Sequence, residues 1–231
     1  MCGYICHLSF QGSINLKNFK TGLYDLNHRG PDTSKIIFKK NYFFGHQRLK
    51  IIDLTENASQ PMLSADGRYI IVFNGEIYNY KALKKELKIS NNLFNSDSDT
   101  EVILYSYIKW GKNCLNKFEG IFSFVIYDTI EDIIFAARDR MGVKPLYYKY
   151  DNKGITISSR PGAILKATDQ KLNLNNSALN IYLKAGYIPS PYSIYQGINQ
   201  LEAGNYFFLK KNKTNLKICR WWSSNFFYPR L

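Results

Sequence analysis

Cysteine is scarce in this 231-residue chain, and its spacing offers no support for a zinc site. The four cysteines are Cys2, Cys6, Cys114 and Cys219, and none belongs to a C-x2-C pair. Residues 1–10 lack the basic n-region and the long apolar h-region of a signal peptide. No apolar run approaches the roughly 18 residues of a membrane span. We therefore expect a cytoplasmic protein with reduced thiols, no metal, no cofactor of its own and no membrane partner.

Acidic residues are also few: 18 Asp and Glu stand against 31 Lys and Arg, which gives a formal net charge of +13. A basic face is the electrostatic footprint of phosphate binding, so nucleic-acid binding is one alternative. The excess, however, is mostly lysine scattered from Lys17 to Lys217, and the basic runs are short, as at Lys39-Lys40. This scatter is typical of compositional drift, and no nucleic-acid partner is expected.

Internal repeats, low-complexity linkers and sharp breaks in composition are absent, which favours one domain. Apolar residues make up 45% and aromatic residues 16% of the chain, enough for a sizeable core. Polar turns at Asp128–Asp132 and Asp151–Gly154 predict two hairpins. Short apolar and aromatic runs predict strands over residues 42–46, 69–73, 122–127, 133–137, 146–150, 155–158 and 206–209.

The clearest helix signal begins at Ser98. Ser98-Asp99-Thr100-Glu101 has the S-x-x-E pattern of a capping box, and Gly111 lies where a C-cap would end the helix. Weaker patterns predict helices over residues 80–88 and 177–185, and a first helix over 16–27. Clustered strands with helices between them predict an α+β fold whose layers are built on antiparallel sheets.

Cys2 stands directly after the initiator methionine. Removal of Met1 is expected because cysteine is small, and it would leave Cys2 with a free α-amino group of ordinary pKa about 7.7–8.0, suited to general-base catalysis. One residue would then supply both the thiol nucleophile and the base. The alternative is that position 2 simply holds a structural cysteine. Cys6 is interpreted as a small core residue on the first strand.

Three further positions fit amide chemistry. Asn74-Gly75-Glu76 follows an apolar strand, and a side-chain amide beside a glycine N–H makes a sensible oxyanion pair. Arg48 ends another strand and could bind a carboxylate bidentately. Asp99, in the first helical turn, could bind an ammonium group. The alternatives are a strand-ending turn, a surface arginine and a favourable charge at a helix N-terminus. Together, however, the four features are what an amidase for an amino acid needs.

These residues occur in motifs that resemble the N-terminal glutaminase domain of glutamine-hydrolysing asparagine synthetases, a class II glutamine amidotransferase. The motifs follow the family's order over residues 1 to about 222. They are Met1-Cys2-Gly3; His28-Arg29-Gly30-Pro31-Asp32; Gly45-His46-Gln47-Arg48-Leu49; Asn74-Gly75-Glu76-Ile77-Tyr78-Asn79; Ser98-Asp99-Thr100-Glu101-Val102-Ile103; Phe118-Glu119-Gly120-Ile121-Phe122; Arg138-Asp139-Arg140-Met141-Gly142-Val143-Lys144-Pro145-Leu146-Tyr147-Tyr148; and Gly186-Tyr187-Ile188-Pro189-Ser190-Pro191.

The resemblance implies the N-terminal-nucleophile hydrolase fold, a four-layer αββα sandwich with two antiparallel sheets. It implies that Cys2 attacks the side-chain amide of L-glutamine, forms a γ-glutamyl thioester and releases ammonia, with its own amino group as the base. Asn74 and the Gly75 N–H would hold the oxyanion. The site that binds glutamine would comprise Arg48 for the α-carboxylate, Asp99 with Glu76 for the α-ammonium, and the backbone of Leu49, Lys50, Ile51 and Ile52.

The same resemblance assigns other parts of the chain. The segment His28–Asp32 would be a loop that shapes the site, and neither His28 nor His46 would have a chemical role. Residues 1–222 would form the glutaminase domain and residues 223–231 the start of a linker to a synthetase domain. No Ser-Gly-Gly pyrophosphate loop and no Walker pattern is present, so ATP and Mg²⁺ are expected only in a separate synthetase half. That half is the expected partner, and a homodimer is possible.

One stretch departs from the family pattern. Ser159-Arg160-Pro161-Gly162-Ala163-Ile164-Leu165 has a base where the family has an acid, and it includes an added Pro and Gly. In the family this stretch faces the synthetase half, so the acceptor of the amide group is open: aspartate is expected, and another acceptor is an alternative. A second alternative is an inactive glutaminase-like domain that binds or regulates a synthetase subunit.

Overall fold

The computed structural model describes residues 1–12, 14–88, 94–169, 171, 173–211 and 216–224. Its named strands form two six-stranded sheets with antiparallel pairing throughout. In spatial order the first sheet consists of β10 (Asn199–Gln200), β8 (Tyr147–Asp151), β9 (Gly154–Ser158), β1 (Gly3–Ser9), β3 (Tyr42–Arg48) and β2 (Thr33–Lys39). The second consists of β12 (Lys217–Arg220), β11 (Asn205–Lys210), β7 (Ile133–Arg138), β6 (Gly120–Asp128), β5 (Tyr69–Ile77) and β4 (Met62–Leu63).

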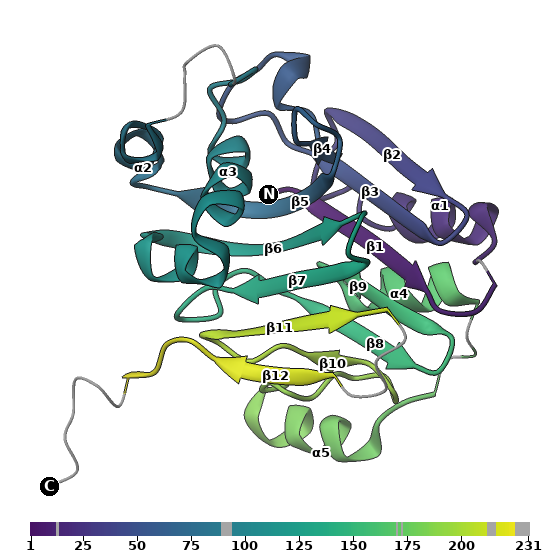
Figure 1. Cartoon of the computed structure of the whole chain (residues 1–231). Helices are drawn as coiled ribbons and strands as arrows, with labels where there is room; N and C mark the ends of the chain where they lie inside the picture. The colour runs from purple at the N-terminus through teal and green to yellow at the C-terminus, as the bar shows by residue number, and fades with distance from the viewer. Residues whose placement is uncertain (13, 89–93, 170, 172, 212–215, 225–231) are drawn as a thin grey trace, which may run out of the picture.

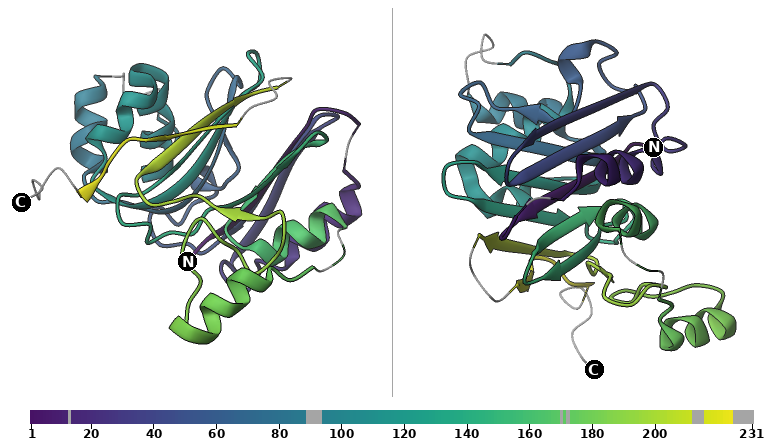
Figure 2. Two further views of the ribbon diagram at one scale, coloured as in Figure 1. Left: turned by 90° about the horizontal axis from the view of Figure 1, so that it is seen from below. Right: turned by 90° about the vertical axis from the view of Figure 1, so that its right-hand side faces the viewer.

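The two sheets face each other, and helices cover their outer faces (Figures 1 and 2). Helices α1 (Leu16–Tyr24) and α4 (Pro161–Thr168) pack together over the first sheet. Helices α2 (Tyr80–Leu87) and α3 (Asp99–Trp110) cover the second sheet. Short 3-10 helices occur at η1 (Glu56–Ala58) and η3 (Gly111–Lys117), and α5 (Asn176–Ala185) lies at one end of the molecule (Figure 1). The predicted α+β class and the αββα sandwich are confirmed.

Alternation along the strands sorts the side chains between the layers. In β1, Tyr4 and Leu8 belong to the buried cluster between the sheets, whereas Ile5 packs toward α1 and α4. In β5, Ile70 and Val72 join the cluster between the sheets, whereas Phe73 packs toward α3. The central strands of both sheets are therefore buried on both faces, which explains why β6 and β7 are mostly apolar.

Several predicted elements have the expected bounds. Ser98 caps α3 by accepting a hydrogen bond from the Glu101 N–H, and Gly111 ends the helix with a positive φ of 55°, which favours glycine. The predicted turns join β6 to β7 and β8 to β9 as hairpins. The first helix ends at Tyr24, three residues before its predicted end at Asn27.

Other elements were not expected from the sequence. The divergent stretch after Ser159 contains α4, with Arg160 as its N-cap and Pro161 in its first turn. Proline suits that position because its missing N–H has no helical acceptor there and its φ already fits the helix. Strand β2 was also missed, because it lies at a sheet edge and alternates exposed with half-buried residues.

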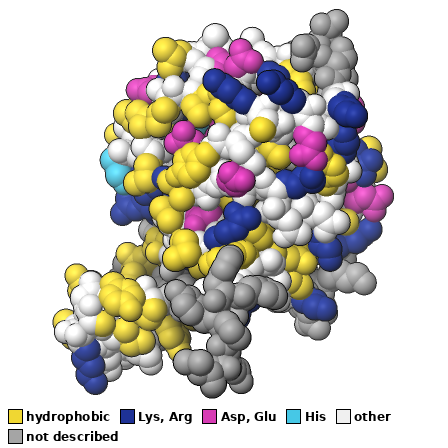
Figure 3. All heavy atoms as spheres, turned by 90° about the vertical axis from the view of Figure 1, so that its left-hand side faces the viewer, with side chains coloured by type: hydrophobic (Ala, Val, Ile, Leu, Met, Phe, Trp, Pro, Cys, Tyr) yellow, Lys and Arg dark blue, Asp and Glu magenta, His cyan; other side chains and the backbone are white. Residues whose placement is uncertain are grey.

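The charged side chains on the surface can be compared with the formal net charge of +13. On the face shown in Figure 3, basic side chains are interspersed with acidic and apolar ones. In the described parts of the chain, no helix is both long and apolar enough to cross a membrane. Of the expected linker 223–231, residues 225–231 lie outside the described residues, and the domain boundary stays a prediction.

Candidate active site

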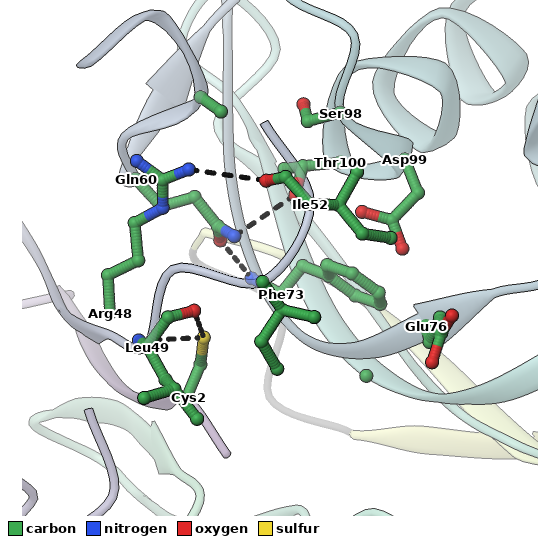
Figure 4. Close-up of a pocket in the computed structure, with 13 residues that line it drawn as sticks. Cys2, Arg48, Leu49, Ile52, Gln60, Phe73, Glu76, Ser98, Asp99 and Thr100 are labelled. Atoms are coloured by element: carbon green, nitrogen blue, oxygen red, sulfur yellow. Dashed lines mark hydrogen bonds between the residues drawn. The ribbon is translucent and has the colours of Figure 1, made fainter. Parts of the chain in front are cut away.

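A cavity of about 60 Å³ opens where one end of the first sheet meets β5 and the start of α3 (Figure 4). Cys2 directly precedes β1, Arg48 ends β3, Gly75 lies in β5, and Asp99 begins α3. Eight of the predicted site residues line the cavity, namely Cys2, Arg48, Leu49, Ile51, Ile52, Gly75, Glu76 and Asp99. The structure thus brings together residues that are separated by up to 97 positions in the sequence.

Strand register explains this convergence. Gly3 pairs with Gln47, so Cys2 and Arg48 meet at the end of the β1–β3 ladder. Alternation places Cys2 on the inward face of the first sheet, and Asn74, two residues after Val72, on the inward face of the second. The predicted nucleophile and the predicted oxyanion donor therefore come from opposing sheets.

The Cys2 thiol is held by the backbone of the next strand end. The Leu49 N–H donates to Cys2 Sγ at 3.4 Å, and the thiol contacts the Leu49 carbonyl oxygen at 3.6 Å (Figure 4). Burial raises the pKa of the Cys2 thiol, although the Leu49 hydrogen bond, the α-amino group of the chain and the Arg48 guanidinium oppose that rise. A thiol in this environment is protonated at neutral pH and needs a base before it can act as a nucleophile.

The loop that contains His28–Asp32 contacts the backbone around Cys2. Arg29 Nε donates to the Cys2 carbonyl oxygen at 3.0 Å, and Asp32 Oδ2 accepts the Lys50 N–H at 2.8 Å. These two bonds fix the backbone on both sides of the thiol. This agrees with the expectation that the loop shapes the site.

Arg48 is buried, and its guanidinium is enclosed by the following loop. It donates to the carbonyl oxygens of Thr55 at 2.8 Å and Ile52 at 3.4 Å, and to that of Asp53. Asp53 has a left-handed backbone with φ 51°, and its side chain accepts the Thr55 N–H. The loop therefore folds back around the guanidinium, which stays at the cavity wall. Its predicted contact with a substrate carboxylate stays a prediction.

The Asn74-Gly75 pair combines a buried side-chain amide with a position that accepts only glycine. Asn74 is 1% exposed, and its Nδ2 has no hydrogen-bond acceptor in the part of the chain that the structure describes. A buried donor of this kind is costly unless a ligand supplies the acceptor. Gly75 has φ 156°, and an added Cβ would lie 2.1 Å from the Ile121 carbonyl oxygen, so only glycine fits. Asn74 is not itself among the residues that line the cavity.

Asp99 forms the opposite wall. It is 5% exposed, and its Oδ2 accepts the Ile77 N–H at 3.0 Å. The pKa of Asp99 is raised to about 6, mainly by burial and also by the nearby Glu76 carboxylate, while hydrogen bonds from the backbone, including the Ile77 N–H, act in the opposite direction. Among the described residues, no cationic side chain forms an ion pair with Asp99. An ammonium group bound here would neutralise its carboxylate.

The sequence missed several residues of the cavity. Gln60, Phe73, Ser98, Thr100 and Ala58 also line it. No local pattern marks Gln60, because its partners lie 13 and 40 positions away.

Lys50, in contrast, was expected at the site and does not line the cavity. Its ammonium group pairs with Glu56 at 2.8 Å, near the surface.

No group of three or more His, Cys, Asp or Glu in the described residues could hold a metal ion. The cavity walls carry one thiol, one guanidinium, two carboxylates and neutral polar groups. This set suits a zwitterionic amino acid with a reactive carbonyl group.

The sandwich of two antiparallel sheets covered by helices on both outer faces is the fold of the N-terminal-nucleophile hydrolases. Residues 1–222 match the model of the glutamine amidotransferase domain family, and the chain belongs to that family. It is related to glutamine-hydrolysing asparagine synthetases.

Named relatives agree with this assignment. The chain is 36% identical to a putative glutamine-hydrolysing asparagine synthetase 2 of Methanocaldococcus jannaschii, with 96% of this chain and 46% of the relative covered. It is also 36% identical to the glutamine-hydrolysing asparagine synthetase 3 of Bacillus subtilis, with 86% of this chain and 32% of the relative covered. The chain thus spans less than half the length of these relatives.

Solved structures share the fold. Glutamine phosphoribosylpyrophosphate amidotransferase from B. subtilis, solved with ADP and GMP, superposes with a TM-score of 0.68 at 19% identity, over 97% of this chain and 50% of that one. A class-II glutamine aminotransferase domain protein from Silicibacter pomeroyi superposes with a TM-score of 0.51 at 11% identity, over 95% of this chain and 98% of that one.

Proposed function

We propose that this chain is a glutaminase domain that hydrolyses L-glutamine to glutamate and ammonia through a thioester on Cys2. The observation that carries the proposal is the convergence of the Cys2 thiol, Arg48, Gly75 and Asp99 on one cavity. The family match and the asparagine synthetase relatives support the same reaction class.

The nucleophile needs a base because burial raises the pKa of its thiol. Met1 is 57% exposed and accessible for removal, after which the α-amino group belongs to Cys2 itself. That amine takes the thiol proton, directly or through a water molecule. The sulfur then forms a bond to the amide carbon of glutamine, and the carbonyl electron pair moves to oxygen.

The tetrahedral oxyanion needs donors that already point toward it. The buried Asn74 Nδ2 and the Gly75 N–H fill this role. The Phe73 and Ile77 N–H groups bond to side chains on the free edge of β5, and alternation directs the Gly75 N–H to the same edge. When the tetrahedral species collapses, ammonia leaves with the proton held by the amine. Water then cleaves the thioester, which releases glutamate and restores the thiol.

Substrate specificity comes from the two ends of the amino-acid backbone. Arg48 binds the α-carboxylate, and Asp99 with Glu76 binds the α-ammonium. The backbone of residues 49–52 forms the wall between the thiol and the guanidinium. A substrate held at both charges presents its side-chain amide to Cys2 only if the intervening carbon chain has the right length.

The ammonia is used by an asparagine-synthetase-type partner, which amidates aspartate with ATP and Mg²⁺. The names of the relatives support this acceptor. The partner is a synthetase domain or a separate subunit, and the cofactors belong to it.

The test measures glutamate and ammonia released from L-glutamine by purified protein whose Met1 has been removed. Turnover that disappears in Cys2→Ala supports the proposal. Binding to a synthetase without any turnover in the presence of that partner would instead favour a regulatory domain.

A further inference from the structure

Strand β5 continues well past its edge neighbour. The short β4 pairs only with Ile70 and Ile71, so from Phe73 onward no strand of the described residues pairs with this edge of β5. Side chains occupy this edge instead. Gln60 Oε1 accepts the Phe73 N–H at 2.6 Å, and His46 Nε2 lies 3.1 Å from the Phe73 carbonyl oxygen. The backbone N–H and the carbonyl oxygen of Phe73, directly before Asn74 and Gly75, are thus both held by side chains.

The His46 contact has a defined direction. His46 is fully buried on β3, and burial lowers the pKa of its imidazole to about 4. The ring is therefore neutral near pH 7 and carries one N–H. Since the Phe73 carbonyl oxygen can only accept, the hydrogen must be on Nε2. His46 therefore donates from the first sheet to the second, next to the predicted oxyanion donors.

Gln60 makes a second bond that reaches the helix. Its Nε2 donates to Thr100 Oγ1 at 3.0 Å, and Thr100 follows Asp99 in the first turn of α3 (Figure 4). Gln60 is 5% exposed and Thr100 is 3% exposed, so solvent does not compete for these bonds. One chain of contacts therefore joins β3, β5 and α3, the three elements that carry Arg48, Gly75 and Asp99.

We infer that Gln60 and His46 are positioning residues that hold the Phe73 peptide, and through it the direction of the Asn74 amide and the Gly75 N–H. The inference rests on the proposed glutaminase function. An oxyanion donor works only within a few tenths of an ångström of the developing charge, and the side chains at this edge replace the strand that would otherwise fix β5. Their loss therefore weakens binding of the tetrahedral species more than binding of glutamine.

The first variant is Gln60→Leu, which keeps the volume and removes both hydrogen bonds. We expect kcat for glutamine hydrolysis to fall at least tenfold, with KM within threefold of the original protein. Inhibition by the aldehyde analogue of glutamine, whose adduct with Cys2 is tetrahedral, weakens by a similar factor. Inhibition by the planar product glutamate stays within threefold. Rates are expressed per Cys2 thiol that reacts with an active-site label, so a smaller fraction of folded protein does not lower the measured kcat.

Gln47→Leu is the matched control. Gln47 is equally buried, and its Nε2 donates to the Leu23 carbonyl oxygen at 3.3 Å on the opposite face of β3. The same substitution there removes a buried hydrogen bond without touching Phe73. We expect a lower Tm, with kcat and aldehyde inhibition within twofold of the original protein.

Two His46 variants give the same test if Gln60→Leu does not fold. In His46→Gln the side-chain Nε2 can reach the position of the imidazole Nε2 and donate to Phe73, whereas His46→Leu cannot donate. We expect His46→Gln to retain at least a third of kcat and His46→Leu to lose at least tenfold.

The inference is overturned if kcat per titrated site in Gln60→Leu is within twofold of Gln47→Leu, or if both His46 variants have the same kcat. It is also overturned if aldehyde and glutamate inhibition weaken equally, because that indicates a general distortion of the pocket. Failure of the proposed function is distinguishable, since the unsubstituted protein would then release no ammonia.

Discussion

Cys2 Sγ lies 3.4 Å from the backbone nitrogen of Leu49, the residue that directly follows Arg48. One strand end therefore positions both the proposed nucleophile and the guanidinium proposed to bind the substrate carboxylate. The distance between these two groups depends on β3 and on its register with β1, both parts of the buried sandwich, and not on a mobile side chain alone.

Replacing Cys2 by alanine removes the proposed nucleophile. We expect glutamine hydrolysis to fall by roughly 10³-fold or more, as for other nucleophile deletions. Ammonia and glutamate release measure the loss. The control is Cys219→Ala, a partly buried thiol on β12 at the far edge of the second sheet, which should leave the rate unchanged. Equal rates in the two variants would remove Cys2 from the mechanism.

Asn74→Ala tests the oxyanion site. Loss of one donor should cost about 3 kcal/mol of transition-state stabilisation, or about 10²–10³ in kcat, with little change in KM. Steady-state kinetics on glutamine measure both constants. Asn205→Ala is matched to it, since Asn205 is also a buried asparagine in the second sheet but lies outside the cavity. An unchanged kcat in Asn74→Ala would refute the assigned role.

Arg48→Lys keeps the charge and loses the forked geometry that holds the loop at residues 52–55. Because lysine cannot donate to several carbonyl oxygens in that plane, the carboxylate site loses its shape. We expect KM for glutamine to rise by about tenfold or more, since each 1.4 kcal/mol of lost binding is one factor of ten. Arg68→Lys, at an ion pair with Asp128 away from the cavity, should leave KM unaltered. A KM shift in Arg68→Lys as large as that in Arg48→Lys would argue against a specific carboxylate site.

The pH profile reports on Asp99. Its pKa is raised to about 6, and only the ionised carboxylate attracts the substrate ammonium, so kcat/KM should fall as the pH decreases through 6. An α-amino group of ordinary pKa, about 7.7–8.0, takes up one proton below that pH and can then no longer act as the base. The slope of log kcat/KM against pH should therefore steepen from about one to two below pH 6.

Asp99→Asn should raise KM at every pH and keep a slope of one throughout. Measured kcat/KM between pH 5 and 9 separates the two proteins. An unmodified protein whose slope stays at one down to pH 5 would contradict the ammonium-binding role.

The parts of the fold that the sequence predicts are those with local causes. The Ser98 cap and Gly111 define α3, and the polar turns define two hairpins, because each signal lies within a few residues of its effect. The α4 helix was missed because it contains Pro161. Proline is favourable in the first turn of a helix and unfavourable in its interior, and the sequence alone does not show where this helix starts.

The site residues also divide into those with a local sequence signal and those whose role depends on the folded structure. Cys2, Arg48, Gly75 and Asp99 are recognisable from their motifs, and their convergence follows once the strands pair. Gln60 is different, because its role depends on an unpaired edge of β5 that exists only in the folded sheet. Asn74 was expected at the site, but its side chain is buried and does not line the cavity. The sequence pattern alone could not distinguish a residue of the cavity wall from one buried next to it.

The most direct measurement compares glutamine turnover in protein samples that differ in the fraction of chains retaining Met1, with that fraction determined by intact mass. If the Cys2 amine is the base, specific activity should rise in proportion to the Met1-free fraction and extrapolate to zero where Met1 is fully retained. Full activity in protein that keeps Met1 would contradict the account, because the amine would then belong to Met1 and could not serve the thiol.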